Sequence, residues 1–151
     1  MAVTVEQIKN LRAKTGLGIN DIKAALEEAG GDEAKAIAWL KEKGLSTVAK
    51  KADRSTSQGL IDVYAHSGRI GAMVEVNCET DFVARNDDFK AFVHDLALQV
   101  ASMNPENIDE LLKQEFFKDP SLTIQDYLNQ TISKIGENIK ISRIARFELG
   151  Q

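Results

Sequence analysis

Residues 74–86 read Val74-Glu75-Val76-Asn77-Cys78-Glu79-Thr80-Asp81-Phe82-Val83-Ala84-Arg85-Asn86. Apolar and polar side chains alternate over the first four positions, which is the pattern of a strand with one buried face. Thr80, a residue type that caps helices, follows this strand, and Asp81 and Phe82 come directly after the cap. The stretch therefore predicts a strand-to-helix corner that presents a carboxylate and a large aromatic ring to another molecule.

The residues around this corner predict a small antiparallel sheet. Alternation over residues 60–65, turn residues at 66–69 and a return strand at 70–77 predict a β-hairpin. A final strand is expected over residues 139–149. Together these strands would form a sheet with helices on one side, which is the α+β class.

The segment between the corner and the last strand predicts three helices. An amphipathic helix is expected from Asp87 or Asp88, acting as its cap, to Met103. A weaker helix is expected over residues 108–116, with Asp119-Pro120 as a break. A third is expected from Ile124 to Ile135, ended by Gly136.

The first fifty residues predict three short helices that bury their apolar stripes against one another. We expect caps at Thr4, at Asn20 and at Asp32. Gly44 is expected to end the third helix.

Two further expectations concern the third helix of this module. Its buried face is expected to carry Ala34, Ile37 and Leu40, with Trp39 on the opposite side. Trp39 would then pack under the following linker or belong to a binding surface. The predicted organisation is a three-helix module at 1–50, a basic linker at 51–58 and an α+β core at 59–151.

Composition limits the function classes. The chain has 151 residues and a net charge of −4, which disfavours a duplex nucleic-acid binder. One cysteine, Cys78, excludes an internal disulfide and is expected to be a half-buried apolar residue, and two histidines cannot complete a structural zinc site. No apolar run approaches a membrane span, and no targeting segment is recognisable. We expect a soluble cytoplasmic protein with no direct nucleic-acid or membrane partner.

No enzyme signature is found. Phosphate-binding glycine motifs are absent, and the paired carboxylates Glu75 and Glu79 have no positioned histidine or nucleophile. We therefore expect no catalytic residue, no metal site and no cofactor. Periodicity by itself favours a buried Phe82, because apolar residues at element ends usually pack inward.

Several blocks distributed along the chain resemble the elongation factor Ts family. They occur in family order, and the last two are highly specific: Ile8–Gly16, Asp21–Leu26, Gly30-Gly31-Asp32, Ala49–Ala52, Gly71–Asn86 and Lys134–Ile139. The resemblance implies a translation elongation factor that promotes GDP release from elongation factor Tu, which it would bind in the GDP-bound and nucleotide-free states.

The resemblance also implies roles for particular residues. The first module would look like a ubiquitin-associated fold and bind the partner's nucleotide-binding domain. Residues with a partner-binding role would be Arg12, Ile19, Asn20, Lys23, Ile135 and Gly136. Family members often carry methionines at the positions of Ile19 and Asn20. The block Thr80, Asp81, Phe82 and Val83 would dislocate Mg²⁺ from the partner's phosphate site.

Two points stay open. Long family members carry two core halves and a helical insertion, for which this chain has almost no room, and short members are homodimers. The resemblance thus implies a homodimer, for which the last strand is a candidate edge. The alternative function is a non-enzymatic peptide-binding or ubiquitin-like binding module. Exchange requires a protruding Asp81-Phe82 pair, whereas the alternative expects the pair to be buried.

Overall fold

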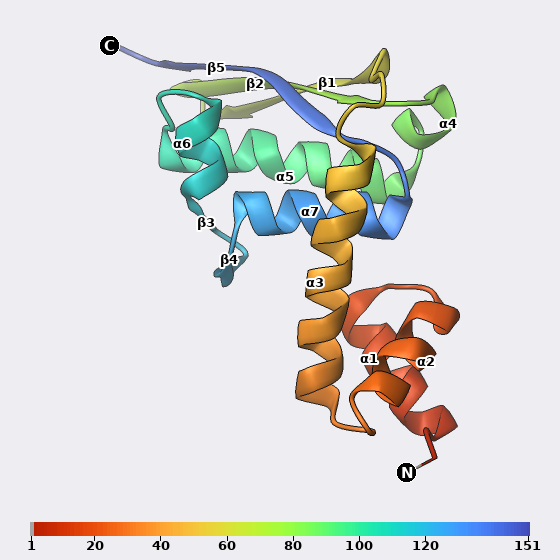
Figure 1. Ribbon diagram of the computed structural model, residues 1–151. Coiled ribbons are helices and arrows are strands. Elements are labelled where there is room, and N and C mark those ends of the chain that lie inside the picture. The colour runs from red at the N-terminus through yellow and green to blue at the C-terminus, as the bar shows by residue number, and fades with distance from the viewer. Residues whose placement is uncertain (1) are drawn as a thin grey trace. The chain divides into compact units, whose positions relative to one another are not determined.

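The computed structural model describes residues 2–151, which form two compact units, the first ending at Lys50 and the second running from Lys51 to Gln151. Within these residues the elements are α1 (Val5–Thr15), α2 (Ile19–Glu28), α3 (Glu33–Lys51), β1 (Gln58–His66), β2 (Ile70–Cys78), α4 (Asp81–Ala84), α5 (Asp87–Met103), α6 (Ile108–Lys113), β3 (Glu115–Phe116), β4 (Asp119–Thr123), α7 (Ile124–Ile135) and β5 (Lys140–Glu148) (Figure 1). The α+β class is confirmed.

The first unit is a three-helix module with its own small core. Leu11 of α1, Ile22 and Leu26 of α2 and Leu40 of α3 are buried together. The predicted capping box at Thr4 is present, because its hydroxyl accepts the Gln7 N–H while the Gln7 side chain accepts the Thr4 N–H. Three helices that are marginal alone are thus stabilised by mutual burial.

Two boundary predictions in this unit are wrong. Gly44 lies inside α3 rather than at its end. A helical glycine costs only about 1 kcal/mol relative to alanine, which the helix-forming residues on both sides offset. Asn20 is not the cap of α2, since Gly18 occupies that position in an extended conformation and the helix starts at Ile19.

The buried face of α3 differs from the predicted one, which was to carry Ala34, Ile37 and Leu40. Ala36 and Leu40 are the buried residues, whereas Ile37 is 41% exposed. Trp39 is half-buried and packs against the core of the first unit, and its role in a binding surface stays a prediction. The apolar positions of α3 admit two phases, and burial of the large indole decides between them.

The second unit is built on a three-stranded antiparallel sheet in the order β1-β2-β5. Its β1-β2 hairpin closes with Ser67 and Gly68, both at positive φ, and the Arg69 N–H donates to the His66 carbonyl at 3.0 Å. Two central residues at positive φ form the turn that matches strand twist. The hairpin and the final strand are confirmed.

Helices cover one face of this sheet, with α5 against the strands and α7 beyond it (Figure 1). Every second side chain of β2 is buried under α5: Ala72, Val74, Val76 and Cys78. Phe89 and Phe92 of α5 are fully buried. This packing gives the strand-to-helix corner a rigid support.

Two further predictions about the second unit are corrected. The cap of α5 is Asn86, whose side chain accepts the N–H groups of Asp88 and Phe89, and both aspartates lie in the first turn. Phe116 lies in β3 and not in a helix, because residues 115–123 form a short hairpin. The Gln99 side chain holds this hairpin by accepting the Phe117 N–H and donating to the Glu115 carbonyl, both at 3.0 Å.

Candidate functional site

The corner predicted at residues 78–82 exists and projects from the end of β2. Thr80 has an extended backbone, and its hydroxyl accepts the Val83 N–H at 3.3 Å, so it caps α4 as expected. Val83 is half-buried and Ala84 is buried. Phe82, in contrast, is 77% exposed. The periodicity that favours a buried Phe82 is therefore overruled, because the helix turns this ring outward.

The Asp81 carboxylate and the Phe82 ring share one neighbour, Arg85. The Arg85 guanidinium donates to Asp81 at 2.8 Å, and it lies 5.8 Å from the centroid of the Phe82 ring. Both members of this ion pair are exposed, so the pair contributes little to stability. The corner thus offers an acid and an aromatic ring that another molecule can reach.

The corner is held from a distant part of the chain by Glu137. One oxygen of the Glu137 carboxylate accepts the N–H groups of Glu79 at 3.1 Å and of Thr80 at 3.0 Å. The other oxygen accepts the Thr80 hydroxyl at 2.7 Å. Hydrogen bonds to a carboxylate are stronger than those between neutral groups.

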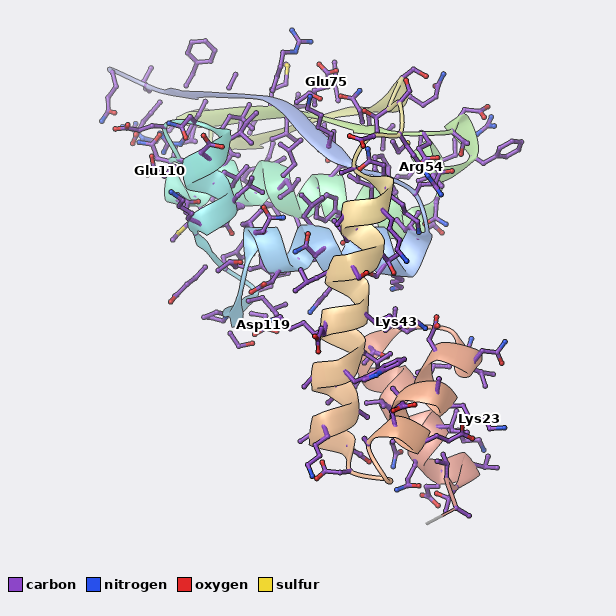
Figure 2. All side chains as sticks on the ribbon, viewed as in Figure 1. Lys23, Lys43, Arg54, Glu75, Glu110 and Asp119 are labelled. Carbon is purple, nitrogen blue, oxygen red and sulfur yellow. The ribbon has the colours of Figure 1, made fainter. Side chains whose placement is uncertain are left out.

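A second set of hydrogen bonds returns from the corner. The Glu79 carboxylate accepts the Asn138 N–H at 2.8 Å and pairs with Arg54 at 3.5 Å. The Asn138 amide donates to the carbonyls of Ala52 and Arg54. Figure 2 shows Arg54 close to the end of the sheet that bears α4. We call Glu79, Glu137, Asn138 and Arg54 the carboxylate clamp.

The clamp brings together two predicted site segments. Ile135 is half-buried at the end of α7, and Gly136 is exposed at positive φ directly before Glu137. The predicted helix stop at Gly136 is confirmed. Sequence reasoning missed the clamp residues as parts of the site, although all except Arg54 lie within the two most specific blocks.

The remaining candidate residues lie on the surface of the first unit. Arg12, Asn20 and Lys23 are exposed, and Ile19 is 50% exposed. Lys23 is 3.8 Å from Glu27 on the same helix. An exposed isoleucine beside exposed cations is compatible with a docking surface.

Cys78 is completely buried at the base of the corner, and not half-buried as expected. Its thiol donates to the Thr80 carbonyl at 3.2 Å. Burial, together with the negative charges of Glu137 and Glu79, raises the pKa of the Cys78 thiol from 9.0 to about 11. The thiol is therefore protonated at neutral pH.

We expect native Cys78 to react with iodoacetamide at pH 8 at least about tenfold more slowly than in the denatured chain, because the thiolate is the nucleophile and is disfavoured in the folded state. Because the pKa of the thiol is higher in the folded protein, the protonated thiol also contributes to the free energy of unfolding. This contribution is complete below pH 9 and is lost as the pH rises towards about 11. Mass spectrometry of timed samples measures the modification. Equal rates in native and denatured protein would contradict the burial of the thiol.

Two further features of the described residues concern metal ligands and membrane spans. Among residues 2–151, no group of three or more histidine, cysteine, aspartate or glutamate side chains is arranged to hold a metal ion. Over the same residues, no helix is long and apolar enough to cross a membrane.

Comparison with known proteins points to one family. The family model described as Elongation factor TS matches residues 79–151. Elongation factor Ts of Synechococcus sp. (strain JA-3-3Ab) is 42% identical, over 100% of this chain and 70% of the relative. Elongation factor Ts of Oleidesulfovibrio alaskensis is 43% identical, over 99% of this chain and 98% of the relative.

These alignments extend over 198 and 195 positions, more than the 151 residues of this chain. The relatives therefore carry segments for which this chain has no counterpart, as expected from the little room left for an insertion. The matched region of the family model begins at Glu79 and includes both the corner and Glu137. The chain belongs to the elongation factor Ts family of translation elongation factors.

Proposed function

We propose that this protein is a guanine-nucleotide exchange factor that binds elongation factor Tu in its GDP-bound and nucleotide-free states and promotes GDP release. The observation that supports this most is the exposure of Phe82, 77%, on a corner that Thr80 caps. The alternative, a peptide-binding or ubiquitin-like module, expects a buried pair, and the exposed ring contradicts that expectation.

The proposed mechanism uses the corner as a wedge. Phe82 enters an apolar gap of the partner, and burying such a ring contributes about 1.5–3 kcal/mol towards a distorted partner state. Asp81 acts beside the partner's Mg²⁺ and phosphate site, where a displaced cation no longer holds the diphosphate. Thr80 and Val83 hold this pair in place, and Ile135 and Gly136 bind the partner beside it.

Nucleotide and exchange factor compete in this mechanism. Their coupling is reciprocal, so each weakens the binding of the other by the same factor. No bond in the nucleotide is made or broken, so the role is not that of an enzyme in the chemical sense and needs no cofactor.

The test of this function is the release of a fluorescent GDP analogue from purified elongation factor Tu. Release is measured with and without the protein, in excess Mg²⁺ and with Mg²⁺ chelated. We expect acceleration in both conditions, with Asp81→Ala less impaired when Mg²⁺ is already removed. No acceleration by the folded wild-type protein would refute the proposed function.

The first unit is proposed as the partner-binding module, with residues 51–58 as a basic linker and 59–151 as the core. We expect charge reversal at both Arg12 and Lys23 to slow association with elongation factor Tu, because exposed cations steer encounter with an acidic surface. The effect should be largest at low salt, where screening is weakest. Stopped-flow association at two ionic strengths measures it.

A matched control for this pair is charge reversal at Lys9 and Lys35, which are also exposed cations of the first unit. Equal association rates for the Arg12 and Lys23 variant and the wild type at low salt would remove both residues from the interface.

We also propose that the protein forms a homodimer. The sheet face away from α5 exposes Ile61, Val63, Met73 and Phe147, and an apolar patch of this kind marks an interaction surface. Strand β5 is also a sheet edge, as the sequence suggested. Phe147 is 80% exposed, and burying its ring against a second copy is favourable.

We expect Phe147→Glu to convert the dimer to a monomer, because it places a charge within an apolar contact. Sedimentation at micromolar concentration measures the mass, and Phe82→Glu, at an exposed ring outside this face, is the control. A wild-type protein that sediments only at the 16.6 kDa of one chain would defeat the homodimer.

A further inference from the structure

We infer that Glu137 is a positioning residue for nucleotide exchange. The hydrogen bonds that its carboxylate accepts, and not its negative charge, set the direction in which Phe82 points, and they act through Thr80. This inference rests on the proposed function of the corner. Glu137 itself is not assigned a contact with the partner. Its role follows from the hydrogen bonds that join the α7-β5 connection to the first turn of α4.

The start of α4 is held by hydrogen bonds, whereas its last residue, Ala84, is held by burial. Helix α4 has only four residues, so its own hydrogen bonds cannot hold it firmly. Three donors at its start, the N–H groups of Glu79 and Thr80 and the Thr80 hydroxyl, all end on the Glu137 carboxylate. A change in this carboxylate therefore acts directly on the residue that caps α4.

Thr80 transmits this constraint to the ring. Its hydroxyl donates to Glu137 at 2.7 Å and accepts the Val83 N–H at 3.3 Å, so one oxygen links the clamp to the helix. Phe82 lies between these two positions in the chain and is 77% exposed, so it has little packing of its own to orient it. The direction of the ring thus depends on the cap.

The clamp acts from both sides, which makes it rigid. The Glu79 carboxylate accepts the Asn138 N–H at 2.8 Å, and the Glu137 carboxylate accepts the Glu79 N–H. Each glutamate therefore accepts a backbone N–H from the segment that contains the other. Arg54 faces Glu79 at 3.5 Å, and the Asn138 amide donates to the Arg54 carbonyl at 2.9 Å. Preorganised contacts lower the cost of ordering a wedge at the moment of binding.

The chemistry of the donors distinguishes a positioning role from a charge contact. In Glu137→Gln the amide oxygen can still accept both backbone N–H groups, and the Thr80 hydroxyl can reverse its role and accept from the amide nitrogen. Glutamine therefore retains the clamp while it removes the charge. Alanine removes both.

The experiment measures GDP release from elongation factor Tu as a function of exchange-factor concentration. We expect Glu137→Ala to lower the maximal release rate about tenfold or more, with less than about a threefold change in half-saturating concentration, because docking through the first unit is retained. Glu137→Gln should restore the rate to within about threefold of the wild type. The matched control is Glu110→Ala, which removes a carboxylate on α6 that accepts the backbone N–H of Glu106.

A double-mutant comparison tests whether Glu137 acts through the ring. Adding Glu137→Ala to Phe82→Ala should cost little beyond the single Phe82 change, because the group to be positioned is already missing. Full additivity would overturn the inference. A Glu137→Gln protein that releases GDP as slowly as Glu137→Ala would also overturn it, since the charge itself would then be needed. A Glu137→Ala protein with the wild-type maximal release rate would overturn it as well.

A measurement without the partner separates this inference from the proposed function. Amide hydrogen exchange of Glu79 and Thr80 should accelerate in Glu137→Ala, while the amides of Val74 and Val76 in the sheet stay protected. Unchanged amide hydrogen-exchange rates at Glu79 and Thr80 would overturn the inference, because the Glu137 carboxylate would then not hold the start of α4. This result does not depend on GDP release from the partner. Failure of the wild-type protein to release GDP would instead refute the proposed function.

Discussion

Phe82→Ala is expected to fold like the wild type and to lose most of its exchange activity. The ring is 77% exposed, so its removal should cost less than about 0.5 kcal/mol of unfolding free energy. Under the proposed function, the same change removes an apolar wedge from the complex, so stimulated GDP release should fall by about ten- to a hundredfold.

Two measurements on one preparation test this expectation. The melting temperature should stay within about 4 °C of the wild type. Release of fluorescent GDP from elongation factor Tu reports the activity. A large fall in melting temperature with normal release by the remaining folded protein would place Phe82 in the core and remove it from the mechanism.

Phe92→Ala is expected to have the opposite profile, with a large loss of stability. Phe92 is fully buried and meets Tyr127 edge-on, with ring centroids 4.9 Å apart. Truncating a buried phenylalanine costs about 3–5 kcal/mol through lost burial and the cavity left behind. That is a large part of the 5–15 kcal/mol that stabilises a typical domain.

The aromatic residues of this chain allow each unit to be monitored separately. Both tyrosines, Tyr64 and Tyr127, lie in the second unit, and the single tryptophan, Trp39, lies in the first. We expect urea unfolding followed by tyrosine signals to shift strongly in Phe92→Ala. Phe82→Ala is the matched control, and identical tyrosine transitions in the two variants would contradict the assignment of Phe92 to the core.

Much of the fold was predictable because its signals are local. The alternation before Thr80, the turn at Ser67-Gly68 and the helix stop at Gly136 are all set by residues close together in the sequence. Boundaries failed where a local preference is weak. Gly44 costs too little to end a helix whose neighbours favour it, and Asn20 cannot act as a cap where the glycine before it already starts the turn.

The site was predictable only in part. Exposure of Phe82 depends on which way α4 faces after packing, and periodicity carries no information on that direction. The Glu137 contact with Thr80 joins residues 57 positions apart, and no local pattern reveals such a pair. The short hairpin of β3 and β4 was missed for a related reason, since its anchor, Gln99, lies on a different element.

The position of β5 has a consequence for how the protein is made. Strand β2 pairs on one side with its sequence neighbour β1 and on the other with β5, so that Val74 meets Ile144. The first pairing closes a tight turn and forms quickly, whereas the second must close a long loop. Strand β2 therefore keeps one edge unpaired until residues 140–148 have been synthesised, and Glu137, which holds the corner at Thr80, is also made late in synthesis.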